Sequence, residues 1–141
     1  MMKKTTVIFV CTNNSARSQM AEGILRHLYG EGYDVYSAGT VPTSVKPLAI
    51  EVMKEIGIDI SHQHSKGIDE LTGIDFDVAV TVCDQAKKTC PVIPGTGMVI
   101  HKSFEDPTDL ASFRKTCAEI KDWIESHFKD PNTLITIPLK L

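Results

Sequence analysis

Residues 6–18 of the chain read TVIFVCTNNSARS, and they give the clearest indication of the fold class. Its first part, Thr6–Val10, is a short apolar run rich in β-branched residues, which predicts a buried parallel strand. A polar loop without glycine follows, and from Ser18 to Tyr29 apolar residues recur at helical spacing. A strand that leads through a short polar loop into a helix is the opening of an alternating α/β chain.

The rest of the chain repeats this alternation. The further strands and helices that we predict are Val35–Ala38, Pro47–Ile56, Phe76–Val82, Met98–His101 and Leu110–Phe128. Strands separated by helices imply right-handed crossovers and a parallel sheet covered on both faces. We therefore expect an α/β fold of three layers, α/β/α, built on a four-stranded parallel sheet.

Length and composition limit the possible classes of protein. A chain of 141 residues fits a single domain, which we place at residues 1–129, followed by an apolar tail, 130–141, of unknown role. The net charge of −3, without a cluster of Lys and Arg, argues against a nucleic-acid partner. No apolar run approaches the roughly 20 residues that span a bilayer, and the N-terminus lacks a signal-peptide cleavage site. We therefore expect a cytoplasmic protein without a membrane segment.

The loop after the first strand has the features of an anion site. In doubly wound sheets, ligands bind beyond the carboxyl ends of the strands, where Cys11 stands. Five residues separate Cys11 from Arg17, enough for backbone N–H groups to surround a tetrahedral anion with the help of the helix dipole. Arg17 adds a planar fork that holds two oxygens. The residues expected to bind the anion are Thr12, Asn13, Asn14, Ser15, Ala16, Arg17 and Ser18.

The same field is expected to lower the pKa of Cys11 and make it a thiolate near neutral pH. Asn14 is suited to a left-handed turn within the loop. Ser18 has two possible roles, donation of its hydroxyl to the thiolate or capping of the helix.

The other cysteines differ in their settings. Thiols in a cytoplasmic chain are reactive or metal-binding more often than structural. The seven-residue separation of Cys83 and Cys90 does not suit a zinc site, and His62 and His64 lack further ligands, so we predict no metal. Cys117 falls on the apolar stripe of the last predicted helix, which indicates an inert core cysteine.

The chain resembles a known family in several segments. These are 7–23 (VIFVCTNNSARSQMAEG), 36–40 (YSAGT), 58–61 (IDIS), 80–83 (VTVC), 90–91 (CP) and 104–107 (FEDP). They are similar to the low-molecular-weight tyrosine phosphatase fold, and more closely to the thioredoxin-coupled arsenate reductases built on it. The resemblance implies an enzyme of arsenic detoxification that turns arsenate into arsenite with no bound cofactor and takes its electrons from thioredoxin. Glutaredoxin with glutathione is the other possible route for the electrons, and we expect the enzyme to be a monomer.

The resemblance also implies the roles of the residues. Cys11 attacks arsenate while Asp106 acts as the general acid, and Cys83 then forms a disulfide with Cys11 as arsenite leaves. Cys90 next attacks Cys83, and thioredoxin reduces the Cys83–Cys90 disulfide. A carboxyl group that faces an anion site should have a raised pKa, which suits Asp106 to proton donation. The segment from Cys83 to Cys90 must move in this sequence, so we predict that its stability is low.

Two other functions are possible from the residues. A phosphatase for aryl phosphates needs only Cys11, Arg17 and Asp106, but Thr108 and Asp109 follow the acid where aryl phosphatases carry aromatic residues. A thiol redox sensor that uses Cys83 and Cys90 would leave the anion loop without a purpose. Some relatives bind potassium beside the loop; Lys66 replaces an acid of that site here, so we predict no potassium.

Overall fold

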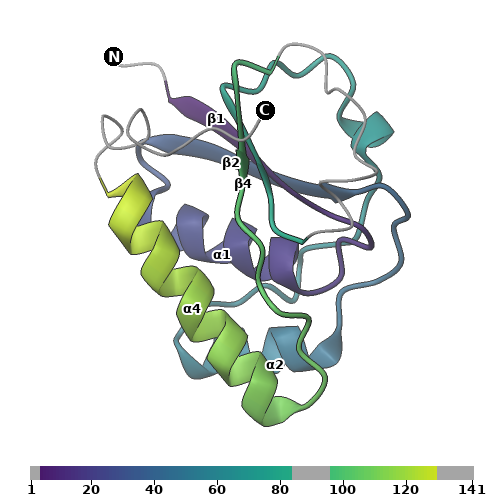
Figure 1. Ribbon diagram of the computed structural model, residues 1–141, viewed down its shortest axis with the longest axis vertical. Coiled ribbons are helices and arrows are strands. Elements are labelled where there is room, and N and C mark those ends of the chain that lie inside the picture. The colour runs from purple at the N-terminus through teal and green to yellow at the C-terminus, as the bar shows by residue number, and fades with distance from the viewer. Residues whose placement is uncertain (1–3, 84–95, 130–141) are drawn as a thin grey trace.

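The computed structural model describes residues 4–83 and 96–129 (Figure 1). The strands are β1 (Thr5–Cys11), β2 (Tyr33–Gly39), β3 (Val78–Thr81) and β4 (Met98–His101). The helices are α1 (Arg17–Tyr29), α2 (Pro47–Glu55), the 3₁₀ helix η1 (Ile68–Leu71) and α4 (Leu110–Phe128). Every strand and helix predicted from the sequence is present, and the bounds of β4 and α4 agree with the prediction. The 3₁₀ helix was not predicted, and the predicted tail lies outside the described residues.

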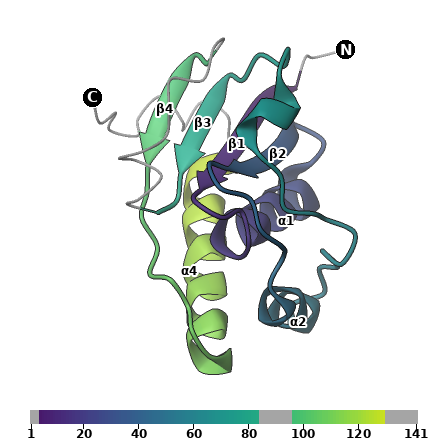
Figure 2. The same ribbon diagram turned by 90° about the vertical axis from the view of Figure 1, so that its right-hand side faces the viewer.

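The four strands form one parallel sheet in the order β2-β1-β3-β4 (Figure 2). The helices α1 and α4 lie side by side against one face of this sheet, and α2 packs on α4. Every residue from Val7 to Cys11 is buried, so both faces of the central strand β1 are covered. The expected α/β fold on a four-stranded parallel sheet is confirmed.

Aromatic side chains on β2 show how the two faces are filled. Tyr33 packs edge-on against Phe128 of α4, with 5.4 Å between ring centroids, and its hydroxyl donates a hydrogen bond to the Phe128 carbonyl. Tyr36 projects from the opposite face of β2, because side chains alternate along a strand. Its ring packs edge-on against Phe76, 5.7 Å away. Strand β2 begins earlier than predicted because its pairing with β1 already starts at Tyr33, which lies opposite Thr5.

The strand order places a topological switch point at the carboxyl ends of β1 and β3. From β1 the chain crosses to β2 on one side and later to β3 on the other. In open parallel sheets, ligands bind where the connections diverge in this way. Cys11 is the last residue of β1, and Cys83 lies two residues beyond the end of β3. The topology therefore brings the two cysteines to one place.

No helix among residues 4–83 and 96–129 is long and apolar enough to cross a membrane.

Candidate active site

The loop between β1 and α1 turns its carbonyl groups outward. The carbonyls of Thr12, Asn13 and Ser15 accept hydrogen bonds from the backbone N–H groups of Val41, Thr43 and Lys46, respectively, at 2.8 to 3.3 Å. In a trans peptide the C=O and the following N–H point in opposite directions. The N–H groups of the loop therefore point inward, which is the arrangement expected of an anion site.

Asn14 gives the loop its curvature. It has a φ of 49°, the left-handed conformation expected from the sequence, and it is the one non-glycine residue with a positive φ in the described part of the chain. Its amide is fully bonded: Nδ2 donates to the hydroxyls of Ser18 and Ser37, while Oδ1 accepts from Gln19 and from the Lys66 backbone. These bonds hold a conformation that few side chains tolerate.

Gly39 allows β2 to approach the loop. A Cβ atom on this residue would lie 2.6 Å from the Thr12 carbonyl oxygen and 2.9 Å from the Asn14 nitrogen. Such distances are shorter than real Cβ contacts, and both neighbours are backbone atoms. The YSAG segment of β2 therefore ends in glycine for a steric reason.

Arg17 begins helix α1 and reaches toward the loop that follows β4. Its Nη1 donates to the Phe104 carbonyl oxygen at 2.9 Å, and its Nη2 lies 3.6 Å from Asp106 Oδ1. The Arg17 side chain is mostly buried, whereas that of Asp106 is 61% exposed. The predicted anion-binding arginine and the predicted acid, 89 positions apart in sequence, are therefore neighbours.

Ser18 lies inside the first turn of α1, where its hydroxyl accepts the Asn14 Nδ2 hydrogen bond at 2.8 Å. The N-cap of α1 is Ala16, without a side-chain bond, so the capping role considered for Ser18 is wrong. The bond from Asn14 occupies the oxygen of Ser18 and leaves its hydroxyl hydrogen for donation, as the first of the two sequence-based roles requires.

Cys11 and Cys83 are buried, reduced thiols that share a hydrogen bond. The Cys83 Sγ also lies 3.7 Å from the hydroxyl of Thr12. The bond to Cys83 raises the pKa of Cys11 above its ordinary value, and burial raises it further, while the Arg17 guanidinium and the Thr12 backbone lower it. The expected thiolate near neutral pH is therefore wrong for this arrangement, because the prediction counted the loop and Arg17 but not the neighbouring thiol.

The remaining predicted residues fall into two groups. Cys90 lies outside the described residues. Cys117 is buried between α4 and α2, where its Sγ lies 3.7 Å from Met53 Sδ, and desolvation raises its pKa to about 11. These values fit the inert core cysteine predicted for this position.

The prediction of no potassium rests on Lys66. Its Nζ lies 3.8 Å from Glu22 Oε1 and donates to the His64 carbonyl oxygen. A tethered ammonium thus stands beside the buried Glu22 carboxylate. Within 4–83 and 96–129, no three His, Cys, Asp or Glu side chains gather to hold a metal ion.

Two polar residues at the site were missed. Gln19 is buried, and its Nε2 donates to Asn14 Oδ1 at 2.8 Å; Gln63 Nε2 in turn donates to Gln19 Oε1 at 2.8 Å. The sequence offered one signal for Gln19, because a polar side chain stands there in the first turn of the helix, next to the apolar Met20. Nothing in the local pattern singled out Gln63.

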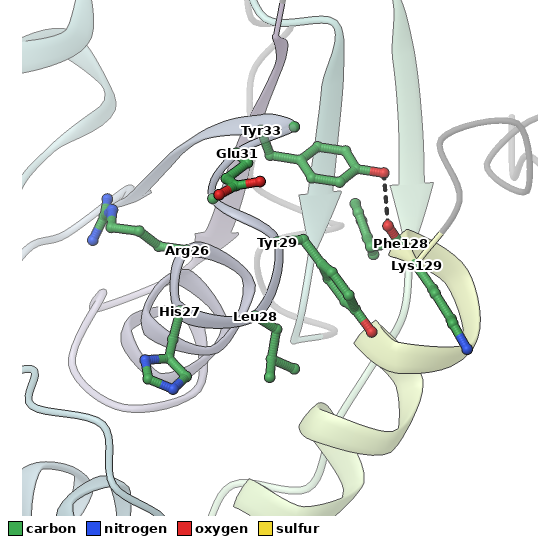
Figure 3. Close-up of a pocket in the computed structure, with 10 residues that line it drawn as sticks. Arg26, His27, Leu28, Tyr29, Glu31, Tyr33, Phe128 and Lys129 are labelled. Carbon is green, nitrogen blue, oxygen red and sulfur yellow. Dashed lines mark hydrogen bonds between the residues drawn. The ribbon is translucent and has the colours of Figure 1, made fainter.

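A surface pocket of about 480 Å³ lies elsewhere, among the end of α1, the start of β2 and the end of α4 (Figure 3). Tyr29, Tyr33, Phe128 and Lys129 are among the residues that line it. The pocket is at the amino end of β2, whereas Cys11 and Arg17 stand at the carboxyl end of β1. We therefore do not assign the chemistry of the cysteines to this pocket.

The chain is similar to known proteins in both sequence and fold. Residues 6–132 match the family described as low molecular weight phosphotyrosine protein phosphatase. The chain is 45% identical over 127 residues to arsenate reductase 1 of Staphylococcus epidermidis, which covers 89% of this chain and 96% of that protein.

Solved structures of similar fold include an arsenate reductase in the phosphate binding state. It has a TM-score of 0.76 and 33% identity, and the match covers 95% of this chain and 99% of that one. The thioredoxin-dependent arsenate reductase of Corynebacterium glutamicum has a TM-score of 0.73 and 27% identity, with 94% of this chain and 63% of that one covered.

Proposed function

The chain belongs to the low molecular weight phosphotyrosine protein phosphatase family, and on that basis we propose that it is an arsenate reductase. The observation that carries the proposal is the contact between two buried thiols, Cys11 and Cys83, beside an anion loop. A phosphatase requires one nucleophilic cysteine, whereas a reductase also needs a second thiol within reach of the first to supply electrons. The reductase therefore accounts for both cysteines.

The first step is a substitution at arsenic. Arsenate binds to the inward N–H groups of the loop and to Arg17, which exchanges its contact with Asp106 for the anion. Because the resting Cys11 thiol is protonated, the bound arsenate dianion takes up the Cys11 proton as sulfur attacks arsenic. Asp106 donates a second proton, one oxygen leaves as water, and a Cys11–arsenic bond has formed.

The second step transfers the electrons. The Cys83 sulfur attacks Cys11 Sγ, the sulfur–arsenic bond breaks, and its electron pair stays on arsenic, which leaves as arsenite. Two thiols are thereby oxidised to a Cys11–Cys83 disulfide while As(V) becomes As(III). Cys83 is suited to this attack because its thiol interacts with that of Cys11 in the resting protein.

The third step restores Cys11. Cys90 attacks Cys83, Cys11 is released as a thiol, and the Cys83–Cys90 disulfide passes its oxidation to an external dithiol. We propose thioredoxin as this donor, because one protein of similar fold is named a thioredoxin-dependent arsenate reductase. The roles of Cys83 and Cys90 follow the resemblance in sequence. The monomeric state and the cytoplasmic location expected from the sequence stay predictions.

The decisive experiment is arsenate-dependent NADPH consumption in the presence of thioredoxin and thioredoxin reductase. We expect turnover in the wild type and its loss in Cys11→Ser, Cys83→Ser and Cys90→Ser. Cys117→Ala is the matched control, because it removes a buried thiol away from the loop and should retain turnover. Hydrolysis of an aryl phosphate that requires only Cys11, without any arsenate turnover, would instead make the protein a phosphatase.

A further inference from the structure

Six polar side chains form a closed ring of hydrogen bonds next to the anion loop. The first half of the ring leads from the loop to an ion pair. Asn14 Nδ2 donates to Ser37 Oγ at 3.0 Å, and Ser37 Oγ donates to Glu22 Oε1 at 2.5 Å. Arg26 Nη2 then donates to Glu22 Oε2 at 2.6 Å. This half connects the loop to α1 and β2.

The second half returns from the ion pair to the loop. Arg26 Nη1 donates to Gln63 Oε1 at 3.3 Å, and Gln63 Nε2 donates to Gln19 Oε1 at 2.8 Å. Gln19 Nε2 closes the ring by donating to Asn14 Oδ1 at 2.8 Å. Gln63 is the ring member that comes from outside α1, β2 and the loop itself.

The two charged members fix the orientation of every amide in the ring. A guanidinium only donates hydrogen bonds and a carboxylate only accepts them. Gln63 must therefore turn its oxygen toward Arg26 and its NH₂ group toward Gln19. Gln19 in turn receives that bond on its oxygen and presents its own NH₂ group to the loop.

The NH₂ group of Gln19 holds a peptide of the anion loop. Besides Asn14 Oδ1, it donates to the Asn14 backbone carbonyl oxygen at 3.1 Å, and it shares this second hydrogen with the His64 carbonyl oxygen at 3.0 Å. This bond keeps that carbonyl outside the loop, and the opposite side of the same peptide is the N–H of Ser15, which therefore points inward. The orientation of the Gln63 amide thus determines, through Gln19, the direction of an N–H group of the anion site.

We propose that Gln63 is a positioning residue for the oxyanion: it orients Gln19, which orients the Asn14–Ser15 peptide. The inference rests on the proposed function in taking a tetrahedral oxyanion as the ligand of the loop. Gln63 itself does not touch the anion in this arrangement and acts through Gln19.

Close packing seats the Gln63 segment against α1. Gly23 of α1 faces this segment, and a Cβ atom there would lie 2.5 Å from Ile60 Cγ2 and 3.4 Å from Gln63 Oε1. Gln63 Nε2 also donates to the Gln19 backbone carbonyl oxygen at 3.1 Å. The segment is therefore held on the helix at two points, and its amide has one orientation that satisfies all partners.

Two substitutions distinguish the role of the NH₂ donor of Gln63 from that of its oxygen acceptor. Gln63→Glu keeps an acceptor for Arg26 and, at neutral pH, has no hydrogen to donate to Gln19. Gln63→Met has similar length and makes neither bond. In both variants, we expect the dissociation constant of inorganic phosphate, measured by calorimetry, to rise about tenfold, the effect of one hydrogen bond to a buried partner.

Steady-state kinetics give a second readout. The KM for arsenate should rise while kcat changes little, because the loop holds the ground state and the transition state alike. The control is Glu55→Gln, which breaks the bidentate pair between Glu55 and Arg114, away from the loop. That variant should bind phosphate as the wild type does.

The outcomes distinguish this inference from the proposed function. Phosphate binding in Gln63→Glu equal to that of the wild type would overturn the inference, even if arsenate is reduced normally. A lower melting temperature of the Gln63 variants, with phosphate affinity unchanged, would also overturn it. Phosphate binding that depends on Gln63, in a protein that never reduces arsenate, would support the inference and refute the reductase.

Discussion

Replacement of Cys83 by alanine should make Cys11 more reactive at neutral pH. The hydrogen bond from Cys11 to Cys83 is the largest cause of the raised pKa of Cys11, ahead of burial. Without it, burial is the main remaining cause that raises the pKa, against the lowering by the Arg17 guanidinium and the Thr12 backbone. The pKa of Cys11 therefore falls in Cys83→Ala, and at any pH below it the thiolate population rises.

The size of the effect follows from the bond that is lost. A hydrogen bond between buried groups contributes on the order of 1 kcal/mol, which corresponds to roughly a tenfold change in the thiolate population. The nucleophilicity of a thiolate falls with its pKa, with a Brønsted coefficient of about 0.4–0.5, which offsets about half of that gain on a logarithmic scale. Alkylation of Cys11 should thus accelerate about threefold.

The assay is the pH dependence of iodoacetamide labelling, quantified on the peptide that contains Cys11 by mass spectrometry. Cys83→Ala should shift the labelling profile to lower pH. Cys83→Ser should also shift it to lower pH, because a serine hydroxyl carries no charge and can donate a hydrogen bond to the Cys11 thiolate, and Cys117→Ala should leave it in place. Labelling profiles of Cys11 that superimpose in the wild type and Cys83→Ala would refute the reasoning.

Three further substitutions probe the loop and the core. Arg17→Lys should weaken phosphate binding about tenfold, because a lysine ammonium lacks the fork that holds two oxygens; unchanged affinity by calorimetry would contradict this role. Gly39→Ala should lower both phosphate affinity and the melting temperature, since its Cβ would stand 2.6 Å from the Thr12 carbonyl oxygen; a variant with wild-type values would show that the loop can move away. Phe128→Ala should cost about 3–5 kcal/mol of unfolding free energy in urea denaturation, because it removes a fully buried ring that contacts Phe9 and Tyr33; a loss below about 1 kcal/mol would contradict that packing.

The fold followed from the sequence to within a few residues at the ends of its elements. Strand β3 is shorter than predicted, Val78–Thr81 in place of Phe76–Val82, because pairing with β1 and β4 begins at Val78. Apolar character extends past the paired residues there: Phe76 is buried against Tyr36 without belonging to the strand. Periodicity reports burial, and burial and strand pairing need not end at the same residue.

The members of the site were predicted better than their electrostatics. The anion loop could be identified because its parts are adjacent in sequence: Cys11, five loop residues, and Arg17 at the start of a helix. The ionisation of Cys11 was predicted wrongly, because it depends on a thiol 72 positions away. Gln63 was missed for the same reason, since its role exists only through Gln19 and Arg26.

The order of strands and helices and the left-handed conformation of Asn14 could be predicted from the sequence alone, and the groups that we propose for anion binding were chosen from it. Each of these depends on residues a few positions apart, whose interactions are fixed by local geometry. Only the tertiary structure decided that Cys83 contacts Cys11, that Asp106 lies beside Arg17, and how the amides around the loop are oriented. A pKa and a hydrogen-bond network depend on distances of a few ångströms between groups that the sheet order brings together, and those distances are set by packing.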